Sequence, residues 1–479
     1  MNFAMIFIVL GWVACFNAVF MLLPAFVGII YQEFAGFAFL NTSIISLIIG
    51  IALLILIKPK KKTLYSREGF VIVSLSWIVM SILGALPLYM SGAIPNFIDA
   101  LFESVSGFTT TGASVVPSVE DLPNCCIFWR SFTHWIGGMG VLVFIMAFLP
   151  LSGAGNMNLM KAESPGPMVG KLVPRVRSTA FLLYAMYFGL TVLEFICLLF
   201  AKMPVFEAIN TSFATAGTGG FGFLNDSMAS VSPTIQIIVT VFMILFGVNF
   251  SAYFLLLYRH WRDAFHISEI WVYFGIIALS SAAITVNIRN LYDSIGEAVR
   301  HATFTVGSII TTTGFSTADF NEWPEFSRTI ILMLMFIGAC AGSTGGGMKV
   351  SRFIIMFKTF IKEIQIQIHP KLVKKIKMDG HEISHETVRS LNIYLIVYIF
   401  IFFSSVLILS VEGHDFITNF SSVAATLNNI GPGLELAGPS QNFAFFSVLS
   451  KMVLIFDMLA GRLELFPMLL LFSPATWKK

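Results

Sequence analysis

Long runs of apolar residues recur along the whole chain, and each is close to the length that crosses a lipid bilayer as a helix. A bilayer core of roughly 30 Å requires about 20 apolar residues in helical form. Hydrophobic residues make up 57% of the 479 residues and charged residues only 11%, whereas soluble domains are about one quarter charged. The sequence therefore predicts an all-α polytopic membrane protein, with spanning helices near 3–31, 38–57, 69–91, 126–150, 178–201, 233–258, 270–288, 326–358, 390–411 and 443–472.

Shorter, half-apolar stretches lie between the long runs. They are too short to span a bilayer, and each leads into a glycine-marked turn. Re-entrant backbone at membrane depth is tolerated only where it lines a water-filled cavity or is buried in protein. Several such stretches in one chain therefore favour a single central pore. They lie at 97–111, 204–219, 297–313 and 415–430.

Basic residues set the direction in which membrane helices insert, because connections rich in Lys and Arg stay in the cytoplasm. If ten helices span, alternate connections and the C-terminal tail hold 22 of the 29 basic residues. Both termini are therefore expected in the cytoplasm, and the short stretches are expected to enter from outside. No charge block is large enough to indicate nucleic acid binding. The cytoplasmic group is Lys58, Lys60, Lys61, Lys62, Arg67, Lys161, Lys171, Arg175, Arg177, Arg259, Arg262, Lys349, Arg352, Lys358, Lys362, Lys371, Lys374, Lys375, Lys377, Arg389, Lys478 and Lys479.

An internal repeat underlies the short stretches. Glycines recur at roughly 100-residue spacing within TTTGAS, GTGGFG, TTTGFS and NNIGPG, namely Gly112, Gly220, Gly314 and Gly431. The second segment is richer in glycine than the others, so its alignment rests on Phe221 matching Phe315. The repeat predicts two additional N-terminal transmembrane helices (1–68) and four helix–pore-loop–helix pseudo-repeats around a central pore (69–177, 178–265, 266–389 and 390–479).

The composition of the glycine loops fits a selectivity filter made of backbone carbonyls. A dehydrated potassium ion needs several oxygen ligands, and rings of carbonyls supply them without a full charge in the bilayer. Glycine readily adopts the conformations that turn successive carbonyls toward one axis, and each short helix points its partly negative C-terminal end at the pore. The predicted K⁺ ligands come from Thr110, Thr111, Gly112, Thr218, Gly219, Gly220, Thr312, Thr313, Gly314, Asn429, Ile430 and Gly431.

Sequence motifs spread over nearly the whole chain resemble those of a known family. They are GFTTTGASV (107–115), WRSFTHWIGGMGVLVF (129–144), ESPGP (163–167), TTTGFSTADF (311–320), FIGACAGSTGGGMKV (336–350), VAATLNNIGPGLE (423–435) and MLAGRLELFPMLLL (458–471). The chain resembles the Trk/Ktr/HKT superfamily of potassium transporters, in particular its TrkH-type membrane subunit, which also has the two additional N-terminal helices. The resemblance implies a homodimer in the bacterial inner membrane and a filter with one glycine per repeat. It also implies a cytosolic, nucleotide-binding RCK subunit similar to TrkA, with K⁺, and also Rb⁺, as the transported ion and no cofactor.

A glycine-rich segment interrupts the apolar run 326–358. Its three adjacent glycines, Gly345, Gly346 and Gly347, would cost a helix on the order of 3 kcal/mol relative to alanine. The backbone groups freed at such a break need water or protein partners at membrane depth. One interpretation is a flexible loop below the filter that obstructs ions in one state, and the other is a passive packing kink. The family resemblance implies the gate.

Arg462 lies deep in the last predicted helix. Arginine costs at least ~2.5 kcal/mol near the bilayer centre and usually faces the protein interior. The favoured interpretation is an electropositive gate element below the filter, near the glycine segment, which the family also implies. The alternatives are a residue that snorkels to the cytoplasmic surface and a structural ion pair. Lys451, in the same predicted helix, is expected to anchor at the membrane interface through its aliphatic stem.

The tract from Lys358 to Arg389 is the longest and most basic cytoplasmic connection, with Lys371, Lys374, Lys375 and Lys377 within seven residues. Attraction to anionic lipid could account for it, at about 1 kcal/mol per basic residue near the surface. The sharper hypothesis is a docking surface for the cytosolic ring, since the tract leads directly from the glycine segment into the fourth repeat.

Other functions remain to be weighed against a channel. An enzyme would need converging nucleophiles, bases or metal ligands, and the eight His are scattered, so the chain is not expected to be an enzyme. A K⁺ symporter coupled to H⁺ or Na⁺ would need titratable residues along the pathway, and Glu194, Asp457 and Glu464 keep that alternative open. In plant relatives, serine at the first filter position accompanies Na⁺ preference, whereas this chain has Gly112 there.

Overall fold

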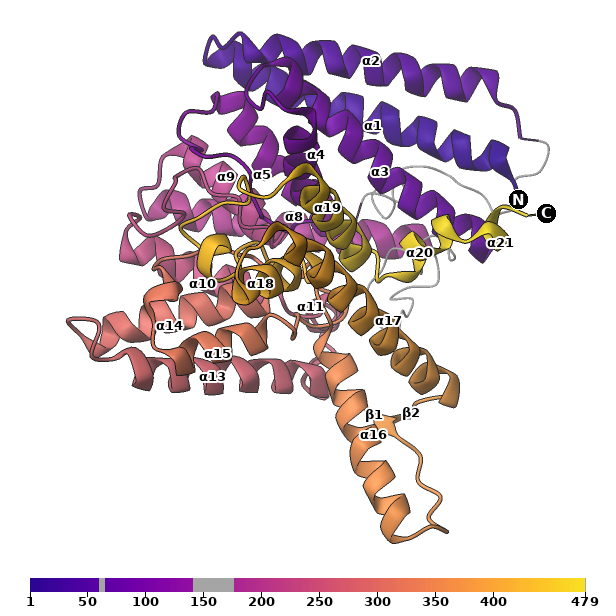
Figure 1. The fold of residues 1–479 in the computed structure, drawn as a ribbon, viewed down its shortest axis with the longest axis vertical. Helices are drawn as coiled ribbons and strands as arrows, with labels where there is room; N and C mark the ends of the chain where they lie inside the picture. The colour runs from indigo at the N-terminus through magenta and orange to yellow at the C-terminus, as the bar shows by residue number, and fades with distance from the viewer. Residues whose placement is uncertain (60–64, 141–175, 479) are drawn as a thin grey trace.

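A computed structural model describes residues 1–59, 65–140 and 176–478. Helices make up nearly all of the regular structure in these ranges, as the sequence predicts (Figure 1). The exception among the described residues is one antiparallel pair of short strands, β1 (Lys377–Met378) and β2 (His381–Glu382). The protein is therefore an all-α membrane fold with a small β-hairpin in the basic tract between Lys358 and Arg389.

The first two helices, α1 (Phe3–Ile30) and α2 (Ala35–Leu56), pack along each other at one side of the molecule (Figure 1). Glycines permit the close approach. A Cβ atom added to Gly50 would lie 2.8 Å from the carbonyl oxygen of Gly11. Small residues at such contacts are common between membrane helices, because lipid leaves close packing as the main attraction between them. This pair precedes the helix–pore-loop–helix units and covers α3 and α5 of the first unit.

Four units of the same design follow, each with a long helix, a short helix that ends at a glycine loop, and a second helix. They comprise α3 (Ser66–Met90), α4 (Phe97–Phe108) and α5 (Asn124–Gly138); α8 (Val176–Phe200), α9 (Val205–Ala216) and α10 (Pro233–Phe246); α13 (Ser268–Ile288), α14 (Ile295–Ile310) and α15 (Glu325–Leu334); and α17 (His385–Leu409), α18 (Phe416–Leu427) and α19 (Val448–Arg462).

Side-chain caps start three of the four short helices. The side chain of Asn96 accepts from the backbone N–H of Ile98 at 2.8 Å, and that of Asp415 accepts from Thr418 N–H at 2.9 Å. Ser294 caps α14 in the same way. Such caps satisfy backbone donors that have no partner within the helix, and they fix where each short helix enters the protein.

The second helices of three units are broken, whereas the sequence predicts continuous helices at 233–258 and 443–472 and only a local break within 326–358. The chain bends by 89° between α10 and α11 (Phe250–Leu257). In the third unit α15 ends at Leu334 and α16 (Val350–Ile368) begins at Val350, so residues 335–349 form a long non-helical segment. In the fourth unit α19 ends at Arg462 and α20 spans Phe466–Phe472.

These breaks change the number of helices that can span a membrane by themselves. Six described helices are long and apolar enough, or seven if the bent pair α10 and α11 forms one span, against the ten runs that the sequence predicts. Helices α5, α15 and α19 have only 15, 10 and 15 residues. The predicted stretch 141–150 lies outside the described residues.

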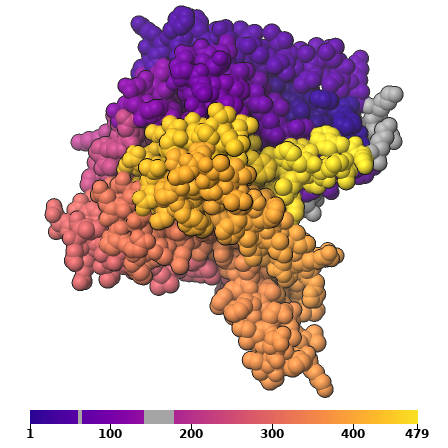
Figure 2. Space-filling model, viewed as in Figure 1, coloured from indigo at the N-terminus to yellow at the C-terminus, as the bar shows by residue number. Residues whose placement is uncertain are grey.

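A projecting arm carries the basic tract that the sequence predicts to be cytoplasmic. Helix α16, the β-hairpin and the start of α17 extend away from the body of packed helices (Figures 1 and 2). α16 continues to Ile368, past its predicted end at 358. A hydrogen bond of 2.8 Å from Lys375 to Glu382 crosses the hairpin, and it lowers the pKa of the Glu382 carboxyl.

The remaining short helices connect these parts and follow the last unit. They are α12 (Trp261–Phe265), α21 (Pro474–Trp477) and the 3₁₀ turns Phe320–Glu322, Ser410–Glu412 and Glu435–Ala437.

Candidate functional site

The four predicted filter loops share one backbone conformation. In each loop a residue two positions before the glycine has a left-handed φ of 52° to 60°, and the glycine itself has φ between 75° and 103°. The second loop follows the same register, with Thr218 and Gly220 in these two positions. A left-handed conformation is disfavoured for most residues, so its repetition indicates four equivalent turns. The residues are Thr110 and Gly112, Thr218 and Gly220, Thr312 and Gly314, and Asn429 and Gly431.

The loops meet in a closed ring. A Cβ atom added to each glycine would strike the carbonyl oxygen of the residue before the glycine in the next loop. The carbonyl oxygens of Thr111, Gly219, Thr313 and Ile430 therefore surround one centre, and each is held against a neighbouring glycine. The added Cβ would lie 1.9 Å from the oxygen of Gly219 at Gly112, and 1.9 Å from that of Thr313 at Gly220. It would lie 2.2 Å from the oxygen of Ile430 at Gly314, and 2.8 Å from that of Thr111 at Gly431.

A cavity of about 160 Å³ opens over this ring and is lined by all four glycines. Its other described lining residues are apolar residues, serines and amides, with Arg130 as the charged exception. Arg130 is paired with Glu103 at 2.7 Å and is buried. This charge is therefore neutralised within the protein, and the described lining of the cavity contains no acidic residue.

His134 connects the segment after Gly220 to α4 of the first unit, a role that the sequence did not reveal. Its Nδ1 lies 2.8 Å from the carbonyl oxygen of Gly107, and its Nε2 accepts from the backbone N–H of Phe221 at 3.2 Å. Because Nε2 accepts a hydrogen bond, the proton of the neutral imidazole lies on Nδ1, which donates to the carbonyl of Gly107. The ring therefore fixes the residue after Gly220 against the short helix of the first unit.

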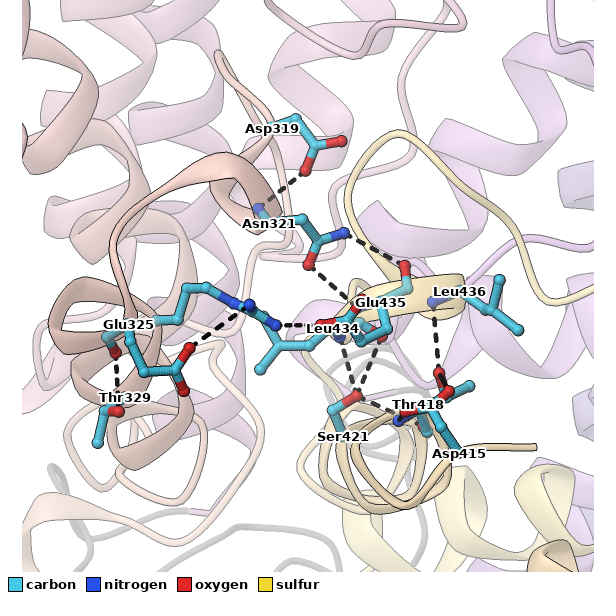
Figure 3. Close-up of polar contacts among 11 residues, drawn as sticks. Asp319, Asn321, Glu325, Thr329, Asp415, Thr418, Ser421, Leu434, Glu435 and Leu436 are labelled. Atoms are coloured by element: carbon cyan, nitrogen blue, oxygen red, sulfur yellow. Dashed lines mark hydrogen bonds and ion pairs between the residues drawn. The ribbon is translucent and has the colours of Figure 1, made fainter. Parts of the chain in front are cut away.

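The outer rim of the fourth loop is held by the third unit. Figure 3 shows Asn321 facing the backbone of Glu435 and Ser421 beneath Leu434. Asn321 accepts from Glu435 N–H at 3.0 Å and donates to its carbonyl at 3.2 Å, while Leu434 N–H donates to Ser421 at 2.9 Å. Arg328 also pairs with the Glu435 carboxylate. The contacts of Asn321 and Arg328 fix the segment after Gly431 to the adjacent unit, and that of Ser421 fixes it to α18 of its own unit.

The non-helical segment 335–349, hereafter the intramembrane loop, lies directly against the filter loops. The backbone N–H of Gly346 donates to the hydroxyl of Thr312 at 2.7 Å. A Cβ atom on Gly346 would meet Asn429 at 2.8 Å, and one on Gly345 would meet the carbonyl oxygen of Thr311 at 3.0 Å. The predicted gate glycines thus fill the space next to the loops of the predicted filter, where larger residues would not fit.

Arg462 reaches this loop as the last residue of α19, which ends there and does not continue as one helix to 472 as predicted. It donates to the carbonyl oxygen of Thr344 at 3.0 Å, and to those of Gly137 and Gly138 at 2.7 and 2.8 Å. The last two carbonyls end α5, where the helix dipole favours a cation. Arg462 therefore links the first unit to the intramembrane loop, and it does not snorkel to the surface.

Three further charged residues differ from their predicted positions, and the first of them binds the loop. Lys349, counted with the cytoplasmic tract, is 1% exposed, and its ammonium group donates to the carbonyls of Gly345 and Gly346. Arg352 is also buried and pairs with Glu464. Lys451 is not an interface anchor, because it is buried and pairs with Asp99 at 2.6 Å.

Glu269, which sequence reasoning missed, holds the two ends of the glycine segment. One carboxylate oxygen accepts from the backbone N–H groups of Ala341 and Ser351, both at 2.8 Å. Its side chain comes from the first turn of α13 and is 2% exposed. An acidic residue at the start of an apolar helix is the one signal in the sequence that could have drawn attention to it.

Comparisons with known proteins agree with this architecture over the full chain. The profile of the TrkH family, described as cation transport protein, matches residues 35–280 and 264–479. The chain is 38% identical to the Trk system potassium uptake protein TrkH of Escherichia coli K12 over 100% of both chains. It is 32% identical to the Trk system potassium uptake protein TrkG of that strain, with 98% of this chain and 97% of TrkG covered.

A solved structure shares the fold. The crystal structure of the potassium transporter TrkH from Vibrio parahaemolyticus superposes with a TM-score of 0.90 at 35% identity, and 100% of each chain is covered. All of these relatives are named as transport proteins, in agreement with the prediction that the chain is not an enzyme. The chain is therefore a multi-span membrane protein that belongs to the TrkH family of cation transport proteins.

Proposed function

We propose that this chain carries K⁺ into the cell across the bacterial inner membrane, through the ring of carbonyl oxygens from the four glycine loops. The closed contact between each glycine and the carbonyl of the next loop carries this proposal. Such a ring replaces the water of a dehydrated cation without a formal charge. Full-length similarity to proteins named for potassium uptake supports K⁺ as the ion.

Several further properties belong to the same proposal. Rb⁺, which is close to K⁺ in size, would also pass, and both termini would face the cytoplasm. The working form would be a homodimer in which each copy has its own pore. Ion flux into liposomes that contain the purified protein tests the ion preference directly. K⁺ and Rb⁺ should enter and Na⁺ and Li⁺ should not; equal entry of all four ions would contradict the carbonyl filter.

The intramembrane loop is the proposed gate. Its backbone contacts Thr312 and Asn429 of two filter loops, so in this position it lies beneath the pore. The carbonyl oxygens of Thr344, Gly345 and Gly346 are held by the cationic side chains of Arg462 and Lys349. We propose that the loop obstructs ions while these contacts persist and that it moves aside when they are lost.

Arg462→Ala is expected to increase K⁺ flux, because a fixed positive charge below the filter holds back cations. The expected gain is about fivefold, which corresponds to the loss of about 1 kcal/mol of repulsion between like charges in a partly desolvated site. Flux into liposomes measures this gain. Arg462→Lys keeps the charge and should stay near wild type; equal flux in both variants and wild type would assign Arg462 a structural role only.

A cytosolic RCK-type subunit that binds nucleotide is the proposed regulator, and the arm is its proposed docking surface. Lys374, Lys375 and Lys377 are exposed there, and Lys375 pairs only with Glu382 of the same hairpin among the described ion pairs. Exposed ion pairs each stabilise a complex by about 0.2–1 kcal/mol. An acidic surface of the partner would therefore need several such contacts to bind the arm.

Changing Lys374, Lys375 and Lys377 to Glu should weaken binding of the cognate RCK subunit by about tenfold, because three favourable contacts of about 0.5 kcal/mol each are lost. Pull-down with the purified subunit measures the loss. Arg259→Glu with Arg262→Glu, on another exposed cytoplasmic connection, is the matched control. Undiminished binding in the triple variant would contradict docking on the arm and leave the pore proposal unaffected.

A K⁺ symporter coupled to H⁺ or Na⁺ is the second candidate. The observation in its favour is that Glu194 and Asp457 are both 0% exposed within the protein, and that Asp457 accepts from Ser405 at 2.9 Å. Buried acids in membrane proteins often mark ion or proton pathways. We rank it second because neither residue belongs to the ring or to the intramembrane loop.

A further inference from the structure

The first turn of α13 is capped by a residue from the cytoplasmic arm. The residue before the helix is Ile267, whose side chain makes no capping hydrogen bond. Asp379 takes this role, since its Oδ1 accepts from the backbone N–H of Ser268 at 2.8 Å although it lies 111 positions later in the chain. An acidic group at a helix N-terminus satisfies an orphan donor and interacts well with the helix dipole.

The local sequence makes Asp379 part of a firm turn. Asp379 and Gly380 both have left-handed φ values, 48° and 79°, and they connect the paired strands β1 and β2. An Asp-Gly pair is favoured in such two-residue hairpins. The hairpin is also attached to α16, because Lys358 donates to the carbonyl oxygen of Lys377 at 2.8 Å. A movement of the arm would therefore move Asp379 with it.

The residue next to the capped position holds the intramembrane loop. Glu269 directly follows Ser268, and its carboxylate binds the backbone N–H groups of Ala341 and Ser351 on either side of the glycine segment. Hydrogen bonds to an ionised acceptor are about twice as strong as neutral ones. Of these two adjacent residues, Ser268 thus contacts the arm and Glu269 contacts the intramembrane loop.

We propose that the first turn of α13 is a mechanical connection between the cytoplasmic arm and the intramembrane loop, with Asp379 and Glu269 as its positioning residues. Its role in transport rests on the proposed function of the loop as a gate. Displacement of the hairpin removes the cap, the first turn of α13 loosens, and the clamp on Ala341 and Ser351 weakens. The coupling thus passes through one shared element.

Amide hydrogen exchange of the full-length protein in lipid nanodiscs tests this connection without any transport measurement. Asp379→Gly removes the carboxylate and keeps a turn that glycine adopts readily, whereas Asp379→Asn keeps a good capping group. We expect peptides that cover 341–351 to exchange about fivefold faster in Asp379→Gly, the change that corresponds to the loss of a cap worth about 1 kcal/mol. Asp379→Asn should match wild type.

Two results would overturn the proposal. One is faster exchange in Asp379→Gly that stays confined to the hairpin and the start of α13, with 341–351 unchanged. The other is equal acceleration in Asp379→Asn, because the cap would then not be responsible. Glu269→Gln tests the contact between α13 and the intramembrane loop. Its neutral oxygen is a weaker acceptor, so amide exchange at 341–351 should become faster. Unchanged exchange there would contradict the clamp.

The gate is tested separately by deleting Gly345–Gly347 and measuring flux. If Asp379→Gly accelerates exchange in the loop but the deletion leaves flux unchanged, the connection holds and the gate fails. If the deletion raises flux but Asp379→Gly leaves exchange in the loop unchanged, the gate holds and the connection is wrong.

Discussion

Deletion of Gly345–Gly347 is expected to raise K⁺ flux by about thirtyfold, because it removes the part of the intramembrane loop that lies against the filter. Gly346 N–H bonds to Thr312, and the carbonyls of Gly345 and Gly346 bind Lys349. Losing even two hydrogen bonds of about 1 kcal/mol each shifts a closed–open equilibrium by roughly that factor. Flux into liposomes, normalised to the amount of inserted protein, measures the effect.

A deletion of equal length in the arm is the matched control. Residues Lys371–Val373 are exposed and far from the loop in sequence, so their removal should leave basal flux unchanged when no partner is present. A Gly345–Gly347 deletion that is well folded by size-exclusion chromatography, yet no more active than wild type, would show that the loop does not obstruct the pore.

Gly112→Ser is expected to lower the ratio of K⁺ to Na⁺ permeability by about thirtyfold. This corresponds to a change of about 2 kcal/mol in the difference between the free energies of K⁺ and Na⁺ in the proposed filter. A side chain at Gly112 would meet the carbonyl oxygen of Gly219 at 1.9 Å, and the position has a φ of 81°. The carbonyl must move, so the proposed filter should no longer fit K⁺. Bi-ionic permeability measurements provide the ratio.

The ring also predicts a graded series. Gly431→Ser should have the smallest effect of the four filter glycines, because its added Cβ would lie 2.8 Å from the carbonyl of Thr111. Gly275→Ser on α13 is the control, since nothing lies within 4 Å of a Cβ at that position. A permeability ratio that stays at the wild-type value in Gly112→Ser would exclude Gly112 from the filter.

The repeated loops could be predicted from the sequence because each carries its own local signal. A glycine that follows a short half-apolar stretch requires only neighbouring residues to be recognised, as at Gly112 and Gly314. The order in which the loops contact one another was not available in this way. That each glycine abuts the carbonyl of the next loop depends on how the units close around the axis.

The helix breaks could be located only in part. The segment Gly345–Gly347 was apparent, but unwinding starts at Met335, among apolar residues that suit a helix equally well. Tertiary hydrogen bonds decide its extent, since Gly338 N–H bonds to Met348 and Cys340 N–H bonds to Gly247. An apolar run contains no signal for such contacts, and the same holds for the bend between α10 and α11.

The residues that support the site were the least predictable. Glu269 acts on backbone groups 72 and 82 positions away, and His134 on one 87 positions away. Lys349 belongs by sequence to a basic tract predicted to be cytoplasmic, yet it is buried and binds the carbonyls of Gly345 and Gly346, just before α16 starts. Charge patterning indicates which side of the membrane a segment faces, and it does not indicate how deep one side chain lies.

The reversal potential of currents through the purified protein tests the central claim most directly. With K⁺ gradients across a planar bilayer, a selective K⁺ channel predicts a shift of about 59 mV per tenfold K⁺ ratio, unchanged when a pH or Na⁺ gradient is added. A reversal potential that moves with the H⁺ or Na⁺ gradient would contradict a K⁺ channel with a carbonyl filter and would favour the coupled symporter.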